Sequence, residues 1–292
     1  MTEPLLVAIE AGGTKFVLAL GRPDGSIAAR HTIPTRGPDE TLAEAAEWFG
    51  RSERVAALGI ASFGPVELDR SDARWGHLLA TPKPGWAGCD IAGHFGRALG
   101  VPVGFDTDVN GAALAEYELG AGRGSGSLAY ITVGTGIGGG LVADGRVLHG
   151  AGHPELGHAF PPRHSADRDF TGTCPHHGDC FEGLASGPGI AARWGAPLSE
   201  LGADHEAHGI VAFYLAHLCA TLACVTAAGT IVLGGGVMQT RGLLDRVASE
   251  AAALDAGYTP GAGRRRIVAP ALGQDSGIVG ALLLAARALA AR

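Results

Sequence analysis

The chain begins with a short unit of strands and turns that occurs a second time further along. An apolar run at 5–9 enters a Gly-Gly-Thr turn and is followed by a second apolar run at 16–20. Asp24-Gly25, a typical hairpin signal, then precedes a third extended run. This order predicts three strands connected by two tight turns.

The second copy starts more than a hundred residues later and has the same order. Its apolar runs lie at 128–133 and 139–143, a Gly-Thr-Gly turn separates them, and Asp144-Gly145 supplies the hairpin signal. An internal repeat of this kind predicts two similar halves that face each other. Two unrelated glycine-rich hairpins are the alternative interpretation.

Length, composition and charge narrow the class of protein. A chain of 292 residues is long enough for two domains, and 46% apolar residues are enough to fill two cores. The net charge of -7 and a pI near 5.9 argue against a nucleic-acid partner and against an anionic membrane surface. The first residues lack the basic start of a secretory signal, so we expect a cytoplasmic protein.

One uncharged stretch, 209–237, is long enough to raise the question of a membrane span. It contains His217, it is interrupted at Gly229, and no basic cluster adjoins it. We therefore expect a buried helix followed by a buried strand, and no membrane association.

The remaining pattern alternates strands with helices, which indicates an α/β architecture with mixed sheets. A domain boundary is expected near 110–125, where the sequence GAGRGSGS has the composition of a hinge. The last helix is expected to pack back on the first domain. Strands are predicted at 55–62 and 101–105 and after residue 229, and helices at 39–50, 89–99, from 108 to about 120, 181–194, 208–227, 241–256 and 275–291.

Three glycine-rich turns each follow an apolar strand: EAGGTK at 10–15, GTGIGGG at 134–140 and LGGGVM at 233–238. Backbone N–H groups in such turns form concave donor sets for anions, and glycine lets a phosphate approach closely. No Walker A sequence occurs. Two such turns on a repeated unit predict a triphosphate held from both sides.

Several stretches together carry a specific resemblance: IEAGGTKFVLALG, FDTDVNGAALAE, YITVGTGIGGGLV, HPELGH, CPHHGDCFEGLASGPGI and IVLGGGVM. In this order the chain resembles the ROK family of sugar kinases, over about 5–285. TPKPGW, HPELGH and the cysteine-containing stretch are most similar to the bacterial zinc-containing fructokinases of that family.

The resemblance implies a two-domain actin-like ATPase fold, related to ribonuclease H, with duplicated mixed sheets and a cleft between the domains. The N-terminal domain is expected to comprise 1–115 and about 275–292, and the C-terminal domain about 116–274. An irregular loop at 152–181 belongs to the second domain in this division.

The same resemblance implies ATP and Mg²⁺ as cofactors. Glu10 is expected to hold Mg²⁺ through water, because Mg²⁺ keeps several waters and needs few carboxylates; a surface acid at a strand end is the alternative. The residues expected to bind ATP are Gly12, Gly13, Thr14, Lys15, Gly134, Thr135, Gly136, Pro188, Gly234, Gly235, Gly236, Val237 and Met238.

Transfer of a phosphoryl group to an alcohol needs a carboxylate that accepts the hydroxyl proton. The resemblance places that role on Asp108, which also has the position of a helix N-cap, where backbone N–H groups keep a carboxylate ionised. A purely capping role for Asp108 is the alternative, and Asp106 is the nearest competing acid. Many relatives have Asn where this chain has Thr107, which puts one sugar contact in doubt.

The expected sugar contacts also come from the resemblance. They are Gly64, Pro65, Asp108, Glu155 and His158. Trp86 either adds to the wall of the sugar site or packs in a core.

Cysteine usage separates one pair from three others. Cys174 and Cys180 lie among histidines, whereas Cys89, Cys219 and Cys224 lie in apolar helical contexts and are expected to be buried thiols. Five cysteines in this distribution argue against a disulfide framework.

Two thiolates and two imidazoles suit tetrahedral Zn²⁺. The predicted ligands are His158, Cys174, His177 and Cys180, with His176 and His153 as competitors for the two histidine positions. Four protein ligands leave no open coordination position, so the zinc is expected to be structural.

The predicted activity is ATP-dependent phosphorylation of D-fructose to fructose 6-phosphate, with Asp108 as general base. A glucokinase, mannokinase or allose kinase is the alternative within the family. A sugar-responsive regulator without its DNA-binding domain and an actin-like ATPase without a small acceptor are less favoured. A homodimer is expected, since relatives are usually dimers.

Overall fold

The structure is a computed structural model that describes residues 4–51 and 55–291. Its contacts divide these residues into two compact units. Unit 1 contains the described residues of Met1–Ala115, Leu148–His153 and Gln274–Arg292. Unit 2 contains Glu116–Val147 and Pro154–Gly273, so the chain passes between the units four times.

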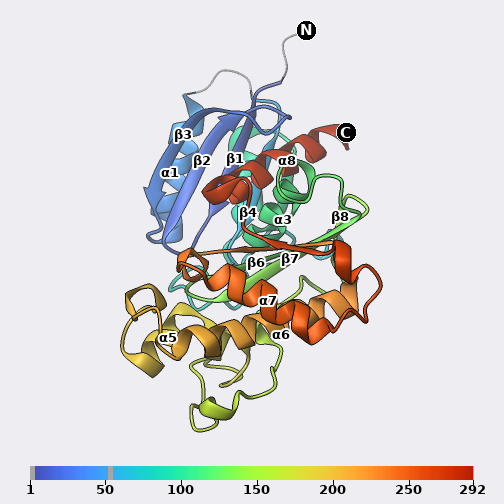
Figure 1. The fold of residues 1–292 in the computed structure, drawn as a ribbon. Coiled ribbons are helices and arrows are strands. Elements are labelled where there is room, and N and C mark those ends of the chain that lie inside the picture. Colours follow the sequence, from blue (N-terminus) through green and yellow to red (C-terminus); the bar gives the residue numbers. More distant parts are fainter. Residues whose placement is uncertain (1–3, 52–54, 292) are drawn as a thin grey trace. The chain divides into compact units, whose positions relative to one another are not determined.

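Unit 1 is built on one five-stranded sheet with the order β3-β2-β1-β4-β5 (Figure 1). The neighbours β3, β2 and β1 are antiparallel, whereas β1, β4 and β5 are parallel. The strands are β1 (Leu6–Ala11), β2 (Lys15–Gly21), β3 (Ile27–Pro34), β4 (Leu58–Ser62) and β5 (Val103–Thr107).

Helices cover both faces of this sheet. One face carries Val7 and Ile9 into a core with α1 (Pro38–Gly50) and α2 (Ile91–Leu99). The other face meets α8 (Ser276–Ala290), which packs along β1, β4 and β5. The approach of α8 is so close that a Cβ on Gly59 would lie 1.8 Å from the carbonyl oxygen of Ala281. The side chains that alternate along each strand thus serve two different helix layers.

Unit 2 repeats the plan with the strand order β10-β9-β6-β7-β8. Its hairpin strands β6, β7 and β8 are antiparallel, and β6, β9 and β10 are parallel. In reverse, this order is β8-β7-β6-β9-β10, so each of its strands has a counterpart in β3-β2-β1-β4-β5. This confirms the repeat predicted from the sequence. The strands are β6 (Ser127–Val133), β7 (Ile137–Ala143), β8 (Arg146–Val147), β9 (Thr230–Gly234) and β10 (Arg266–Val268).

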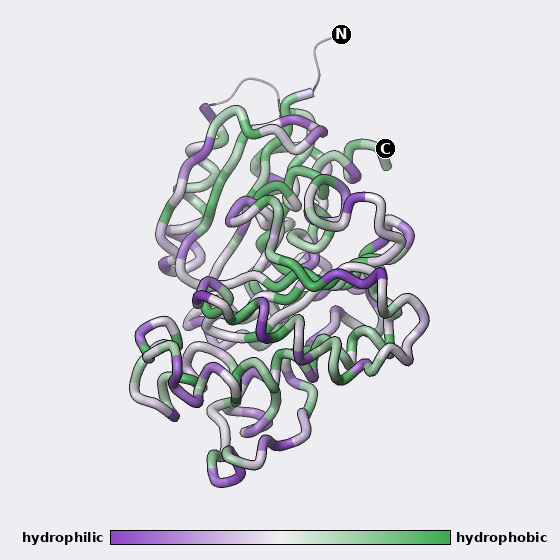
Figure 2. Tube along the Cα trace, viewed as in Figure 1, coloured by the Kyte–Doolittle hydropathy of each residue, from purple (hydrophilic) through white to green (hydrophobic). Residues whose placement is uncertain are grey.

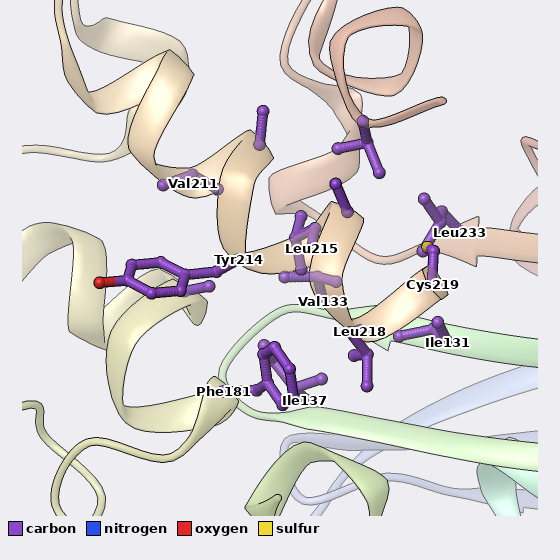
Figure 3. Packing of buried hydrophobic residues seen from close by; sticks show 14 of the residues in the cluster. Ile131, Val133, Ile137, Phe181, Val211, Tyr214, Leu215, Leu218, Cys219 and Leu233 are labelled. Carbon is purple, nitrogen blue, oxygen red and sulfur yellow. The ribbon is translucent and has the colours of Figure 1, made fainter. Parts of the chain in front are cut away.

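The core of unit 2 surrounds α6 (Ala207–Thr226). Twelve of its 20 residues are buried, and Leu215, Leu218 and Cys219 point toward Ile131, Val133 and Leu233 of the sheet (Figure 3). The length and hydropathy of α6 would allow a membrane span, but its burial among strands and neighbouring helices is that of a core helix. This agrees with the buried helix expected for the uncharged stretch.

The other helices of unit 2 are α4 (Phe181–Ala185), α5 (Gly187–Trp194) and α7 (Leu243–Asp255), and α3 (Asp108–Glu118) begins in unit 1 and ends in unit 2. Hydrophobic residues follow the central strands of each unit, and hydrophilic residues gather in the connecting loops (Figure 2). The polar loops are therefore where the site residues are to be sought.

Two predicted elements differ clearly from the structure, and one strand of the structure was not predicted. The single helix expected at 181–194 is two helices, because the hydroxyl of Ser186 accepts a hydrogen bond from Gly189 N at 3.3 Å and starts a new helix there. The strand expected at 55–62 is β4, which begins only at Leu58, and 52–54 lie outside the described residues. The short edge strand β10 was not predicted.

One expected buried thiol is exposed. Cys219 is buried in the unit 2 core and Cys89 is half-buried, but Cys224 near the end of α6 is exposed. None of the cysteines forms a disulfide.

Candidate active site and metal centre

The first glycine-rich turn joins β1 to β2 and is closed by a hydrogen bond from Gly12 N to Lys15 O at 2.9 Å. Thr35 supports it from β3's end, because its hydroxyl donates to Gly12 O at 2.7 Å and its N–H donates to Thr14 O at 2.9 Å. Gly13, Thr14 and Lys15 are exposed. The turn is thus held at its base and open at its tip.

Glu10 lies directly before this turn, at the end of β1. Burial, the largest cause, and the negative charge of Asp108 raise the pKa of its carboxyl from 4.5 to about 7, while Lys15 and Arg30 act in the opposite direction. A Cβ on Gly277 at the start of α8 would lie 2.4 Å from the Glu10 carboxylate, so α8 packs tightly against it. Two carboxylates in one partly buried place favour a cation beside them.

Asp108 is the first residue of α3 and directly follows β5. The capping bond of this helix comes from Thr107, whose hydroxyl accepts a hydrogen bond from Asn110 N at 3.1 Å. Asp108 instead accepts a hydrogen bond from Val109 N at 2.8 Å. The expected N-cap role of Asp108 is therefore wrong, since Thr107 performs it.

Gly64 and Pro65 lie beyond the end of β4 and are joined by a cis peptide bond. The His153 ring packs on Gly64, about 3.6 Å from the position of an added Cβ, and its Nε2 accepts a hydrogen bond from Val66 N at 3.3 Å. This loop, the Glu10 turn and the start of α3 all belong to unit 1.

Trp86 is a core residue. It has no exposed surface, its ring lies 5.4 Å from that of Phe16 and 5.6 Å from that of Phe63, and its Nε1–H donates to Arg36 O at 2.8 Å. Of the two interpretations of Trp86, core packing is the correct one.

In unit 2 the structure brings the second and third glycine-rich turns together. The turn at 134–136 is closed by Gly134 N donating to Gly136 O at 2.9 Å, and Gly134 O accepts from Gly187 N at 2.7 Å, beside Pro188. Gly235, at a φ of 92°, packs on the end of β6, where a Cβ would lie 2.3 Å from Val133 O. Only glycine fits at that position.

Sequence reasoning missed Glu182, which supports the second turn. Its carboxylate accepts a hydrogen bond from Ile137 N at 2.9 Å and lies against Gly136. Glu182 is in α4, and this helix begins directly after Cys180. One short helix therefore links the cysteine-containing loop to the turn. No local signal marks this contact, because 45 residues separate the two partners.

The histidine–cysteine stretch folds into one compact group in unit 2. Cys174 Sγ lies 3.6 Å from His158 Nδ1 and 3.7 Å from His177 Nδ1, Cys180 Sγ lies 3.7 Å from His158 Nδ1, and the two Nδ1 atoms lie 3.3 Å apart. All four ligand atoms lie within 4.8 Å of one another. His176 and His153 are not members of this group in the described part of the chain.

These separations fit one tetrahedral ion. Ideal zinc bonds to nitrogen and sulfur place two nitrogens about 3.3 Å apart and a nitrogen and a sulfur about 3.6 Å apart. His158 directs Nδ1 into the group and Nε2 toward Glu155, whose carboxylate lies 4.0 Å away. The carboxylate expected at the sugar site thus adjoins a residue of the candidate metal centre.

Comparison with known proteins places this arrangement in a family. The ROK family pattern matches residues 6–288. The chain belongs to the ROK family. A relative, the fructokinase of Zymomonas mobilis subsp. mobilis, is 48% identical over 285 residues that cover 95% of each chain. A putative fructokinase of Bacillus subtilis is 42% identical and covers 98% of this chain and 97% of its own.

Solved structures of the ROK family agree. A ROK hexokinase from Thermus thermophilus has a TM-score of 0.82 at 28% identity, over 99% of this chain and all of its own. A ROK family glucokinase from Streptomyces griseus, crystallised with glucose and AMPPNP, has a TM-score of 0.75 over 97% and 99% of the two chains; at 24% identity it shows the fold alone. The predicted actin-like α/β fold with duplicated mixed sheets is confirmed.

Proposed function

We propose that this protein is a fructokinase that transfers the γ-phosphoryl group of ATP to D-fructose and forms fructose 6-phosphate and ADP. The observation that carries the proposal is the similarity, over 82–98% of the chain, to five relatives at 37–48% identity, four of them named fructokinase and one putative fructokinase. The site residues of both units supply the chemistry that this reaction needs.

Asp108 is the proposed general base. It stands at the start of α3, where Thr107 and not Asp108 provides the capping bond. In the reaction its oxygen accepts the proton of the sugar 6-hydroxyl as that oxygen bonds to the γ-phosphorus and the bond to the β-phosphate oxygen breaks. ADP then leaves with the electron pair of that bond.

The glycine turns are the proposed phosphate sites. Backbone N–H groups at the open tips of the turns, at 13–14 and 135–136, donate to phosphate oxygens, and the Lys15 ammonium neutralises part of their charge. Gly234 to Met238 and Pro188 provide the neighbouring contacts to ribose and base. Mg²⁺, held through water by Glu10, supplies charge neutralisation for the triphosphate. The raised pKa of Glu10 reflects a place where a cation is favourable.

Zinc is the proposed resident of the group formed by His158, Cys174, His177 and Cys180, and it stabilises the loop around them. His158 is then held by its Nδ1, so that Nε2 faces Glu155 and both are available to sugar hydroxyls. Gly64 and Pro65 are proposed sugar contacts of unit 1. We also propose that the protein acts in the cytoplasm as a homodimer.

A coupled assay of ADP release across fructose, glucose, mannose and allose tests the proposal. We expect the highest kcat/KM with fructose and little ADP release without sugar. A clear preference for another hexose would assign a different kinase of the ROK family, and sugar-independent turnover would reject a sugar kinase altogether.

A further inference from the structure

A cluster of three polar side chains lies beside Asp108 and has no role in the mechanism above. Asp106 at the end of β5, Asn110 in the first turn of α3, and His149 after β8 form what we call the Asp106 cluster. All three belong to unit 1, although 43 residues separate Asp106 from His149. The chain thus returns from unit 2 to place a histidine at this point.

The Asp106 carboxylate is buried, with 3% of the residue exposed, and both of its oxygens are engaged. One oxygen accepts hydrogen bonds from Asn110 Nδ2 at 2.6 Å and from Thr107 N at 2.8 Å. The other lies 2.9 Å from His149 Nε2. A buried carboxylate whose two oxygens both hold donors of the protein is an orienting group.

The imidazole of His149 is held at one nitrogen and open at the other. Its Nε2–H donates to Asp106, while Nδ1 forms no hydrogen bond with any described residue, and 41% of the side chain is exposed. The Asp106 carboxylate therefore fixes the tautomer and the ring orientation, as carboxylates do for functional histidines. A neutral Nδ1 accepts a hydroxyl hydrogen, and a protonated one donates to a hydroxyl oxygen.

The cluster also contains an unmet buried acceptor. Asn110 has no exposed surface, and its Oδ1 has no hydrogen-bond partner among the described residues. Buried polar atoms without a partner are rare in folded proteins and cost stability unless water or a ligand satisfies them. This observation points independently to an outside donor at the cluster.

The position of the segment agrees with a place in the sugar site. His149 contacts Asp106, two residues before Asp108, and His153 on the same segment packs on Gly64 beside Pro65. The segment 148–153 therefore bridges two parts of unit 1 that the proposed function assigns to the sugar.

We propose that His149 is a hexose-contacting residue and that Asp106 is its positioning residue. The inference rests on the proposed function and adds to it a contact that the Asp106 cluster directs at a sugar hydroxyl.

Two substitutions of His149 distinguish a contact with the sugar from a hydrogen bond that only holds the segment 148–153 in place. His149→Gln places an amide near the position of Nε2, so it retains the donor to Asp106 but lacks the imidazole Nδ1. His149→Ala removes both. We expect each variant to raise KM for the preferred hexose roughly ten-fold or more, because about one hydrogen bond to a polar group is lost. KM for ATP should change less than about two-fold.

Asp106→Asn tests the positioning role. We expect a similar rise of KM for the hexose, and the double variant with His149→Ala should be no worse than either single variant, because the two residues act through one contact. His31→Ala is the matched control, since His31 is an exposed histidine of unit 1 on β3. Its KM values should equal those of the wild type.

The outcomes distinguish this inference from the proposed function. A His149→Gln variant with wild-type KM for the hexose, beside a normally active wild type, would overturn the sugar contact and leave the kinase intact. If His149→Gln had a normal KM for the hexose while His149→Ala did not, the role of His149 would be to hold the segment 148–153 in place and not to contact the sugar. Wild-type protein inactive on every hexose would reject the proposed function and this inference with it.

Discussion

Asp106 and His149 form a carboxylate–imidazole pair in which a 2.9 Å contact joins a buried acid to a half-exposed ring. The hydrogen bond that His149 donates to the Asp106 carboxylate, and the negative charge of that carboxylate, raise the pKa of His149 above its usual value of 6.5, against the opposing effect of partial burial. The pair therefore favours the protonated imidazole in the folded protein.

This pair predicts a defined pH effect. A histidine with a raised folded pKa contributes stability that is fully present below pH 6.5 and is lost as pH rises through the folded pKa. Titration of the His149 ring by NMR should give a pKa above 6.5, and Asp106→Asn should lower it. An unchanged pKa in the variant would contradict the pairing.

The metal centre predicts one zinc per chain. Elemental analysis of protein purified without chelators should find it, and Cys174→Ser should lose the metal and lower the melting temperature, because the loop around 158–180 depends on the four ligands. Cys224→Ser is the matched control, since Cys224 is exposed and lies outside the group. Zinc-free wild-type protein with an unchanged melting temperature would rule out the site.

Asp108→Asn should lower kcat about 10³-fold, because removal of a general base typically costs between 10² and 10⁴. The amide keeps the shape of the residue, and α3 retains its cap from Thr107. ATP binding measured by calorimetry should stay close to that of the wild type. Asp204→Asn, an exposed acid in unit 2, serves as the control. A near wild-type rate would remove Asp108 from the chemistry.

The fold was predictable largely because the chain repeats itself. Glycine-rich turns after apolar runs located the two hairpins, and the structure places Gly12 and Gly134 in equivalent closing bonds of 2.9 Å. The four members of the metal group were also predictable, because three of them are spaced three residues apart and only two histidine positions were ambiguous.

Contacts between distant segments were not predictable from one sequence. The bond from Ile137 to Glu182 and the pair of Asp106 with His149 join residues more than 40 positions apart, and no local pattern marks either. The capping role of Thr107 was not predicted for a different reason. Thr107 and Asp108 are both good capping residues, and only the geometry shows whether the hydroxyl or the carboxylate accepts the helix N–H.

Glu116 lies where the chain enters unit 2, and we predict that its substitution lowers the stability of the protein. Its carboxylate has no exposed surface and accepts hydrogen bonds from the N–H groups of Ala121, Ala271 and Leu272 at 2.8–3.0 Å. Glu116→Gln replaces one acceptor by an NH₂ group that faces these donors. We expect a loss of about 2 kcal/mol in the free energy of unfolding, measured by urea denaturation.

Glu200→Gln is a suitable comparison for that experiment. Glu200 is exposed, so its substitution makes the same chemical change outside a buried hydrogen-bond network. Equal stability of the two variants would show that the carboxylate of Glu116 is not needed to join 121 and 271–272.

Gly59 in β4 leaves the least room for a Cβ among the described glycines of unit 1. A Cβ there would lie 1.8 Å from Ala281 O and 2.6 Å from Ala285 N, so Gly59→Ala must displace the α8 backbone from the sheet. Overpacking of a well-packed core costs about 1–3 kcal/mol, and more where the backbone itself must move. The melting temperature should therefore fall by several degrees. Gly50→Ala is the matched control, since nothing lies within 4 Å of the added methyl group. A Gly59→Ala variant as stable as Gly50→Ala would mean that α8 does not pack on β4 as closely as the structure has it.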